Sequence, residues 1–68
     1  MSKLKKYSPY IKLKHELSRK KISYLEVAIL LGKSVRTISM KINGYSDFYI
    51  SEQQKICDAF GIRQEVFF

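Results

Sequence analysis

The stretch that decides the fold of this 68-residue chain is SYLEVAILLGKSVRTISMKING, residues 23–44. It opens with an apolar helical run that contains one small residue, Ala28, and that stops at Gly32. Ser34 follows shortly afterwards and can cap a second helix by accepting a hydrogen bond from a backbone N–H of the first turn. That helix carries apolar side chains at helical spacing: Val35, Ile38 and Ile42. The stretch therefore predicts two short helices joined by a tight turn that contains glycine.

Two short helices joined in this way are the physical description of a helix-turn-helix, here over about residues 24–43. Ser23 with Glu26 predicts a capping box at the start of the first helix. Asn43-Gly44 supplies a left-handed exit after the second. The second helix of such a unit can enter the major groove of DNA. The motif therefore indicates a DNA-binding protein.

The flanking segments predict further short helices. Ser8-Pro9 favours a helix start, and a first helix is expected over about residues 9–20. Ser51 with Gln54 is expected to form another capping box, which opens a fourth helix. The expected fold class is all-α, a compact bundle of four to five helices over residues 8–68, with a short last helix or turn. The loop before the fourth helix is expected to return two side chains to the core: Phe48 and Ile50.

The chain is strongly basic. It holds 13 Lys and Arg against 6 Asp and Glu, which gives a formal net charge of +7 and a pI of about 9.7. Such an excess favours a polyanion as partner, because each neutralised phosphate releases counterions. Lys3, Lys5 and Lys6 stand in a basic N-terminal arm over residues 1–7, which either tracks a DNA groove or stays solvated. Together with the helix-turn-helix, the charge predicts double-stranded DNA as the partner.

Several classes of protein are disfavoured. With Cys57 as sole cysteine and His15 as sole histidine, the chain offers neither an internal disulfide nor a metal site. We find no Ser/His/Asp pattern, no carboxylate pair for acid–base work and no phosphate-binding glycine loop, and we expect no enzyme activity and no cofactor. The longest apolar run, Val27–Leu31, is far shorter than the roughly 20 residues of a transmembrane helix. We expect a cytoplasmic protein, associated with the nucleoid when bound to DNA, without a membrane or small-molecule partner.

The second helix of the motif has two faces on a helical wheel. Ile38 and Ile42 anchor it to the core, and polar side chains cluster away from them. Arg36 can donate to O6 and N7 of guanine, and Met40 can touch a thymine methyl group. Val35 borders both faces, so it either joins the core, the safer interpretation, or makes an apolar base contact. The expected base contacts are Val35, Arg36, Ser39 and Met40. The competing interpretation is that any amphipathic helix has a polar face.

Phosphate contacts are expected around the same helix. Lys33 and Ser34 lie in the turn before it, and Lys41 and Asn43 lie near its C-terminal end. Tyr24 opens the first helix, where its hydroxyl either bonds a phosphate or its ring packs on the core.

Two apolar features indicate a further partner. The first helix of the motif is apolar on nearly all sides, and Leu25, Ile29 and Leu30 occupy positions that would otherwise face solvent. Exposed contiguous apolar patches commonly mark interaction sites. At the other end of the chain, Phe67 and Phe68 either close the core or form a dimer contact.

Together these residues resemble the lambda Cro/repressor (XRE-type) helix-turn-helix family. The likeness runs from about Ser8 to Ile62, and its most specific part is EVAILLGKSVRTISMKING, residues 26–44. The loop YSDFYIS, residues 45–51, and the C-terminal helix look especially like small regulators from phages of Gram-positive hosts. The small, turn, buried and closing residues of the motif fall where the family has them: Ala28, Gly32, Ile38 and Asn43-Gly44.

The resemblance implies a role for each matching position. Base contacts would come from Val35, Arg36 and Met40, and phosphate contacts would come from Tyr24, Ser34, Lys41 and Asn43. It also implies a symmetric dimer on operator half-sites about 34 Å apart. This chain departs from the family at Leu25, Ile29 and Leu30, where the family usually keeps the helix polar.

Two functions follow as hypotheses. The first is a Cro-like phage or prophage transcriptional regulator that binds operator DNA as a homodimer and excludes polymerase. The alternative is a protein-binding modulator, an anti-repressor or co-repressor that forms a heterocomplex with a phage repressor through the apolar patch. A third interpretation has the patch covered by Leu4 and Tyr7 of the chain's own N-terminal segment.

Overall fold

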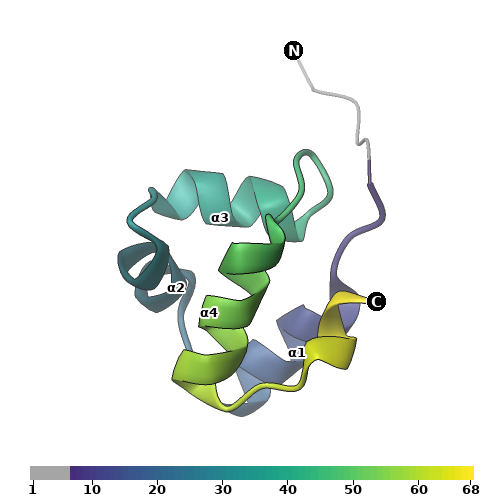
Figure 1. Cartoon of the computed structure of the whole chain (residues 1–68). Coiled ribbons are helices and arrows are strands. Elements are labelled where there is room, and N and C mark those ends of the chain that lie inside the picture. Colours follow the sequence, from purple (N-terminus) through teal and green to yellow (C-terminus); the bar gives the residue numbers. More distant parts are fainter. Residues whose placement is uncertain (1–6) are drawn as a thin grey trace.

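The computed structural model describes residues 7–68, and every regular element among them is helical (Figure 1). The elements are α1 (Ile11–Arg19), α2 (Tyr24–Leu31), α3 (Val35–Ile42), α4 (Ile50–Phe60) and a final 3-10 helix, η1 (Gln64–Phe67). The all-α class predicted from the sequence is confirmed for this part of the chain. No helix within residues 7–68 is long and apolar enough to span a membrane. Of the basic arm expected over residues 1–7, only Tyr7 belongs to the described residues.

The start of α1 differs from the prediction. Tyr10 is its N-cap residue and makes no side-chain cap, so Ser8 does not cap this helix. Instead, the backbone N–H of Tyr7 donates to the carbonyl oxygen of Gly44 at 3.0 Å, and that of Tyr10 donates to the carbonyl oxygen of Ile42 at 2.9 Å. These bonds hold the segment against the end of α3. A long-range contact therefore overrides the local helix-start signal.

The next two helices follow their local signals closely. The Ser23–Glu26 capping box is confirmed, with Glu26 N–H donating to Ser23 Oγ at 3.2 Å and Ser23 N–H to Glu26 Oε2 at 2.7 Å. Gly32 ends α2 in the left-handed conformation, at φ 65°. The hydroxyl of Ser34 accepts from Thr37 N–H at 3.1 Å and so caps α3. Residues 32–34 alone join α2 to α3, and the two helices pack on each other. In Figure 1, α3 lies across the top of the view and α2 lies beside its start.

The α4 helix begins one residue before the expected cap. Its N-cap residue is Tyr49, whose N–H donates to Glu52 Oε1 at 2.9 Å. The predicted Ser51–Gln54 capping box is therefore wrong. Ser51 and Gln54 are both exposed within the helix, and the Glu52 carboxylate accepts the hydrogen bond at the helix start instead.

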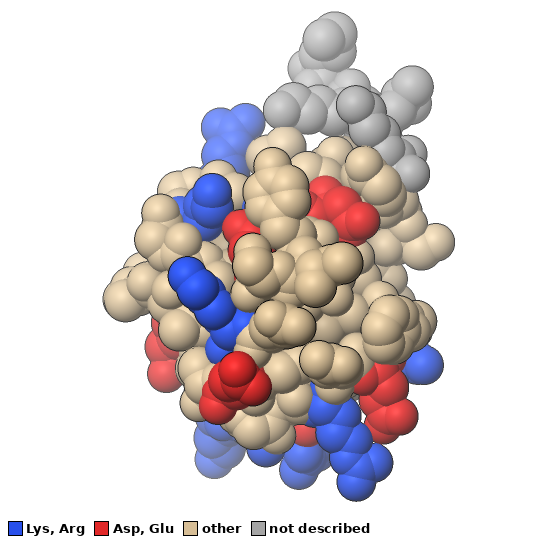
Figure 2. All heavy atoms as spheres, viewed as in Figure 1, with Lys and Arg blue, Asp and Glu red and all other residues tan. Residues whose placement is uncertain are grey.

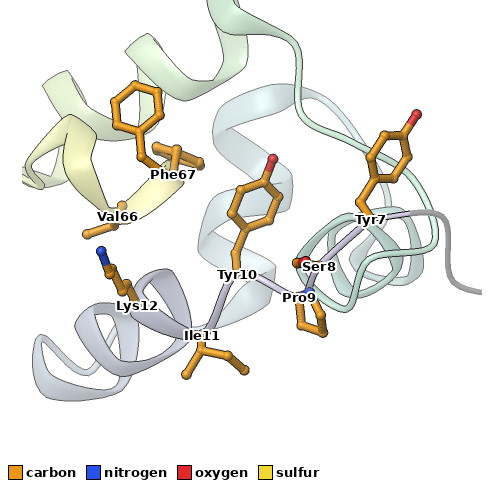
Figure 3. A pocket seen from close by; sticks show the side chains of 9 residues that line it. Tyr7, Ser8, Pro9, Tyr10, Ile11, Lys12, Val66 and Phe67 are labelled. Atoms are coloured by element: carbon orange, nitrogen blue, oxygen red, sulfur yellow. The ribbon is translucent and has the colours of Figure 1, made fainter.

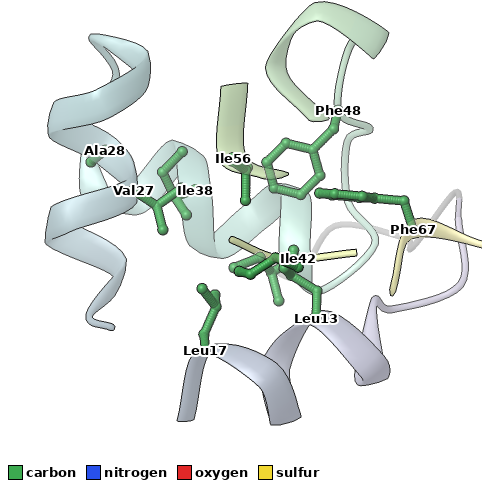
Figure 4. Packing of buried hydrophobic residues seen from close by; sticks show 10 residues of the cluster. Leu13, Leu17, Val27, Ala28, Ile38, Ile42, Phe48, Ile56 and Phe67 are labelled. Atoms are coloured by element: carbon green, nitrogen blue, oxygen red, sulfur yellow. The ribbon is translucent and has the colours of Figure 1, made fainter. Parts of the chain in front are cut away.

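One core joins all five elements (Figure 4). Leu13 and Leu17 enter it from α1, Val27 and Ala28 from α2, and Ile56 from α4. The other buried apolar residues are Ile38, Ile42, Phe48, Ile62 and Phe67.

An aromatic trio closes the core beside the C-terminal residues. The rings of Tyr10, Phe48 and Phe67 lie with their centroids 5.5–5.6 Å apart. Phe67 therefore belongs to the core, whereas the adjacent Phe68 is 83% exposed. The expectation that Ile50 enters the core is wrong, since it is 73% exposed. It lies at the first position of α4, before that helix turns its buried side toward the core.

Candidate nucleic-acid interface

One side of the α3 helix packs on the core, and its other side faces outward. Ile38 and Ile42 have no exposed surface, so they fix the rotation of the helix on the core. At about 100° per residue, Arg36 and Met40 lie on the opposite side, and Ser39 lies at its edge, about 80° from the mean direction of the two isoleucines. Arg36 is exposed, and Ser39 and Met40 are half-buried. The structure therefore brings these predicted base-contacting residues to one face of one helix.

The first turn of α3 is its most accessible part. Lys33 and Ser34 in the turn and Arg36 after it are all exposed. Val35 is 42% exposed, so the interpretation that places it in the core is wrong. The Ser34 hydroxyl is already engaged, because it accepts from Thr37 N–H and lies 2.9 Å from Thr37 Oγ1. This turn therefore combines two exposed cations with a small apolar surface.

Lys41 does not lie where the sequence analysis placed it. Its side chain is 9% exposed, and its ammonium group donates to the carbonyl oxygen of Asp47 at 2.7 Å and pairs with Glu52 Oε1 at 3.2 Å. The same group lies 5.0 Å from the centre of the Tyr49 ring. The prediction of a phosphate contact is therefore wrong for Lys41, because its charge is neutralised inside the protein and cannot reach DNA without breaking these contacts.

A helical wheel alone does not find this. Lys41 and Ser39 lie on opposite flanks of α3, each about 80° from the mean direction of the buried Ile38 and Ile42, so the wheel does not tell which of the two is covered. A long cationic side chain on the buried half of a helix needs an acidic partner. Glu52, in the first turn of α4, is the one that the fold supplies.

Two more expected phosphate contacts are engaged within the fold. The Asn43 side-chain amide donates to the carbonyl oxygen of Ser39 at 2.8 Å and to Ser39 Oγ at 3.2 Å. Asn43 is half-buried and thus serves first to finish α3. Tyr24 is also half-buried and packs against the core, which favours the packing interpretation of its ring.

A polar link that was not predicted from the sequence joins the N-terminal segment to the loop after α3. The Tyr10 hydroxyl donates to the carboxylate of Asp47, whose Oδ1 also accepts from Phe48 N–H at 2.9 Å. Burial raises the pKa of Tyr10 to about 12, and the bond to Asp47 adds to the shift. No spacing in the sequence signals this pair, because 37 residues separate its members.

Positive charge is spread unevenly over the described surface. On α2, the turn and α3, the exposed cationic side chains are Lys33 and Arg36, and the exposed acidic side chain is Glu26. In Figure 2 much of the face is uncharged; basic side chains lie left of its centre and along its lower edge, and acidic side chains are scattered among them. Most other cations of the described part belong to α1 and the residues just after it: Lys12, Lys14, Arg19, Lys20 and Lys21.

The apolar patch on α2 is narrower than predicted. Leu25 is 55% exposed and Ile29, one turn later, is 71% exposed. Leu30 is half-buried and packs against the core, so it is not part of an outward surface. Tyr7 lies beside Gly44 and leaves Leu25 and Ile29 uncovered, while Leu4 lies outside the described residues.

A hollow of about 360 Å³ lies between the N-terminal segment and the C-terminal residues. Tyr7, Pro9 and Ile11 line one side, and Phe67 lines the other (Figure 3). Phe68 lines the hollow as well. Within residues 7–68, no group of three or more His, Cys, Asp or Glu side chains is arranged to hold a metal ion.

Searches against protein-family models, curated proteins and solved structures found no match to this chain.

Proposed function

We propose that this protein is a Cro-like transcriptional regulator of a phage or prophage that binds operator DNA in the bacterial cytoplasm through a helix-turn-helix formed by α2 and α3. One observation carries the proposal. The α3 helix follows a three-residue connection and is anchored by two fully buried isoleucines, and its opposite face carries Arg36 and Met40 with Ser39 at the edge. A helix held in this way can present one row of side chains to the edges of base pairs.

Each residue of this face has a chemical role in the proposal. The Arg36 guanidinium donates two hydrogen bonds to a guanine, and Ser39 donates to or accepts from a neighbouring base. Val35 and Met40 contact thymine methyl groups. Lys33 and the backbone at Ser34 contact phosphates and set the register. The bound protein then excludes polymerase by occupying the promoter.

A homodimer is part of the proposal, because two copies double the number of base contacts on a palindromic site. The exposed ring of Phe68 lies beside the apolar hollow at the chain ends. In a two-fold pairing, each copy can insert this ring into the hollow of the other. Phe67 is buried in its own core, so the exposed ring of Phe68 is the one that crosses to the other copy.

The test is a gel-shift titration with DNA that flanks the protein's own gene, in the presence of competitor DNA. Arg36→Ala is expected to weaken specific binding by about 1–3 kcal/mol, because a guanine contact is lost. Arg63→Ala is the matched control: it removes the same charge from an exposed side chain beyond the end of α4. Equal effects of the two substitutions, or no complex that survives competitor, would overturn the proposal.

A second candidate function is supported by Leu25 and Ile29. Their exposure on a helix whose other side is core leaves an apolar surface that fits a protein partner. In this alternative the protein is a modulator that forms a heterocomplex with a phage repressor and changes its DNA binding. Ile29→Glu would then abolish co-elution with the repressor encoded by the same phage, whereas Ile50→Glu, on a side chain equally exposed at 73%, would not. If DNA binding rather than co-elution is lost, the modulator role is excluded.

A further inference from the structure

The α1, α2 and α4 helices end in the same backbone arrangement. In each of them, the N–H of a residue just beyond the helix donates to the carbonyl oxygen five residues earlier, at 2.8–3.1 Å; the donors are Ile22, Lys33 and Ile62. The residue before each donor is left-handed: Lys21 at φ 58°, and Gly32 and Gly61 at φ 65°. Glycine therefore fills this position at two of the helix ends, and lysine fills it at the third.

Lysine is strained at this position. In the left-handed conformation the Cβ of an L-residue comes too close to the following carbonyl oxygen, whereas glycine has no Cβ. Among residues 7–68, Lys21 is the one non-glycine residue with a positive φ. A cation near the end of a helix is favoured by the helix dipole, but Arg19 already supplies one in the last turn of α1. A glycine would end α1 with less strain, so the backbone does not explain the lysine.

Lys21 belongs to a group of four basic residues at the end of α1, which we call the α1 exit cluster: Arg19, Lys20, Lys21 and Arg63. A polar hollow of about 360 Å³ lies beside it, lined by Arg19, Lys20 and Arg63. Glu16 and Glu65 also line the hollow and pair with the two arginines, at 2.6 Å and 3.4 Å. The two lysines have no ion-pair partner within the described part of the chain. Two positive charges therefore remain after each carboxylate is paired.

The electrostatic potential at the hollow is positive. The hydrogen bond from Arg19 holds the pKa of the Glu16 carboxyl below its ordinary value, and the charges of Lys20 and Arg63 act in the same direction. Three cations from two separate segments of the chain thus act on one carboxylate.

The α1 exit cluster is not part of the proposed DNA-binding face. The α1 helix packs on the side of α3 that carries Ile38 and Ile42, whereas Arg36 and Met40 lie on the other side (Figure 4). In Figure 1, α3 lies across the top of the view and α1 lies near the bottom. Figure 2, in the same view, shows basic side chains along the lower edge. The cluster and the outward face of α3 therefore lie on different sides of the core.

A protein segment rich in Asp and Glu fits the cluster better than the other polyanions do. The unpaired lysines require an anionic partner. A second DNA duplex is disfavoured, because the hollow is too small to admit it and its phosphates would lie against Glu16 and Glu65. A second copy of this chain offers no acidic segment, since its remaining acids are isolated or buried: Glu26, Asp47, Glu52 and Asp58.

We infer that the α1 exit cluster binds an acidic segment of a protein partner, whose carboxylates pair with Lys20 and Lys21 and enter the hollow beside them. The inference goes beyond the proposed function, since it does not require DNA on α3. It also explains the strain at Lys21, because a glycine there would remove one of the two unpaired charges.

The probe for the test is a fluorescein-labelled peptide of ten glutamates. Fluorescence anisotropy measures its Kd at about 150 mM salt, where charges more than about 8 Å away are screened. Lys20→Gln/Lys21→Gln should weaken the Kd about fivefold, the effect of two exposed ion pairs. Lys12→Gln/Lys14→Gln is the matched control, because it also removes one exposed and one half-buried lysine and neither lines this hollow. The control should change the Kd less than about twofold.

A loss confined to the first variant supports the inference. Equal losses in both variants, or no peptide binding by the wild-type chain, overturn it. The same titration with a labelled duplex of unrelated sequence tests the other polyanion. If Lys20→Gln/Lys21→Gln weakens duplex binding as much as peptide binding, the cluster is a nucleic-acid surface and the inference is overturned. The operator titration with Arg36→Ala tests the proposed function separately.

The variant Lys21→Gly separates binding from folding. Glycine relieves the left-handed strain, so the melting temperature should rise by about 4 °C or more. The Kd for the peptide should nevertheless weaken about twofold, because one ion pair is lost. A lower melting temperature would show that the lysine stabilises the helix end, and an unchanged Kd would show that its charge makes no contact. Either result overturns the inference.

Discussion

The buried ion pair between Lys41 and Glu52 allows the sharpest test of the structure. Both side chains are 9% exposed, and their charged groups lie 3.2 Å apart. Lys41→Met keeps most of the apolar stem of the side chain but leaves the Glu52 carboxylate buried without its cation. Removing one partner of a buried pair costs about 3–5 kcal/mol, because the remaining charge stays desolvated. The loss of the bond to the Asp47 carbonyl oxygen acts in the same direction.

This cost is large for so small a domain. The total stability of a domain is about 5–15 kcal/mol. In a domain of this length, 1 kcal/mol shifts the melting temperature by about 4–8 °C. Lys41→Met should therefore lower the melting temperature by at least about 12 °C. Lys55→Met, which makes the same change at an exposed position of α4, should change stability by no more than about 0.5 kcal/mol.

Urea unfolding followed by circular dichroism measures the free energy of unfolding of both single variants. A double variant separates the interaction between Lys41 and Glu52 from their contacts with other residues. Lys41→Met/Glu52→Gln removes both charges and retains an acceptor for Tyr49 N–H, so its cost should be clearly less than the sum of the single costs. If Lys41→Met costs less than about 1 kcal/mol, like the Lys55 control, the Lys41 ammonium is in solvent. The reasoning would then be refuted, and Lys41 would again be a candidate for a phosphate contact.

Three further predictions follow from the same structure. Gly44→Ala should destabilise the protein by more than Gly32→Ala, because a Cβ at residue 44 overlaps the backbone of Tyr7, whereas a Cβ at residue 32 meets open space. Gly32→Ala should cost about 1–2 kcal/mol, the strain of an alanine in the left-handed conformation, and urea unfolding of both variants measures the difference. Phe67→Ala should cost about 3–5 kcal/mol of unfolding free energy, whereas Phe68→Ala should leave stability unchanged and weaken self-association in sedimentation experiments; the reverse pattern would contradict the placement of the two rings. The pKa of Tyr10 is raised to about 12, above the about 10 of an unfolded tyrosine, so the stability it contributes is present below pH of about 10 and is lost as the pH rises toward 12. Ultraviolet titration should detect one late tyrosine, which Tyr10→Phe removes.

Much of the local structure could be predicted from the sequence because its signals act over a few residues. Ser23 and Glu26 cap α2 as predicted, and Ser34 caps α3, since each of these hydrogen bonds joins residues three apart. Gly32 ends its helix because a left-handed residue is needed there. The same short range explains why the exposed cation of α3, Arg36, was identified correctly as lying on the outward face.

Errors occurred where a distant part of the chain competes with a local signal. The Ser8-Pro9 start was wrong because the backbone of residues 7–10 bonds to the end of α3. Lys41 was misplaced because its partners come from the following loop and from α4. Neither contact leaves a trace in the spacing of residues along the chain.

The sequence by itself determined that the chain forms short helices, where α2 and α3 are capped, and which side of α3 is apolar, because capping and amphipathic periodicity depend on near neighbours. Only the tertiary structure decided which of two adjacent aromatic rings is buried. Phe67, the last residue of η1, fills the space beside Tyr10 and Phe48, and Phe68, which follows the helix, is exposed. Burial depends on packing between segments far apart in the chain, and neighbouring residues of the same type can therefore have opposite environments.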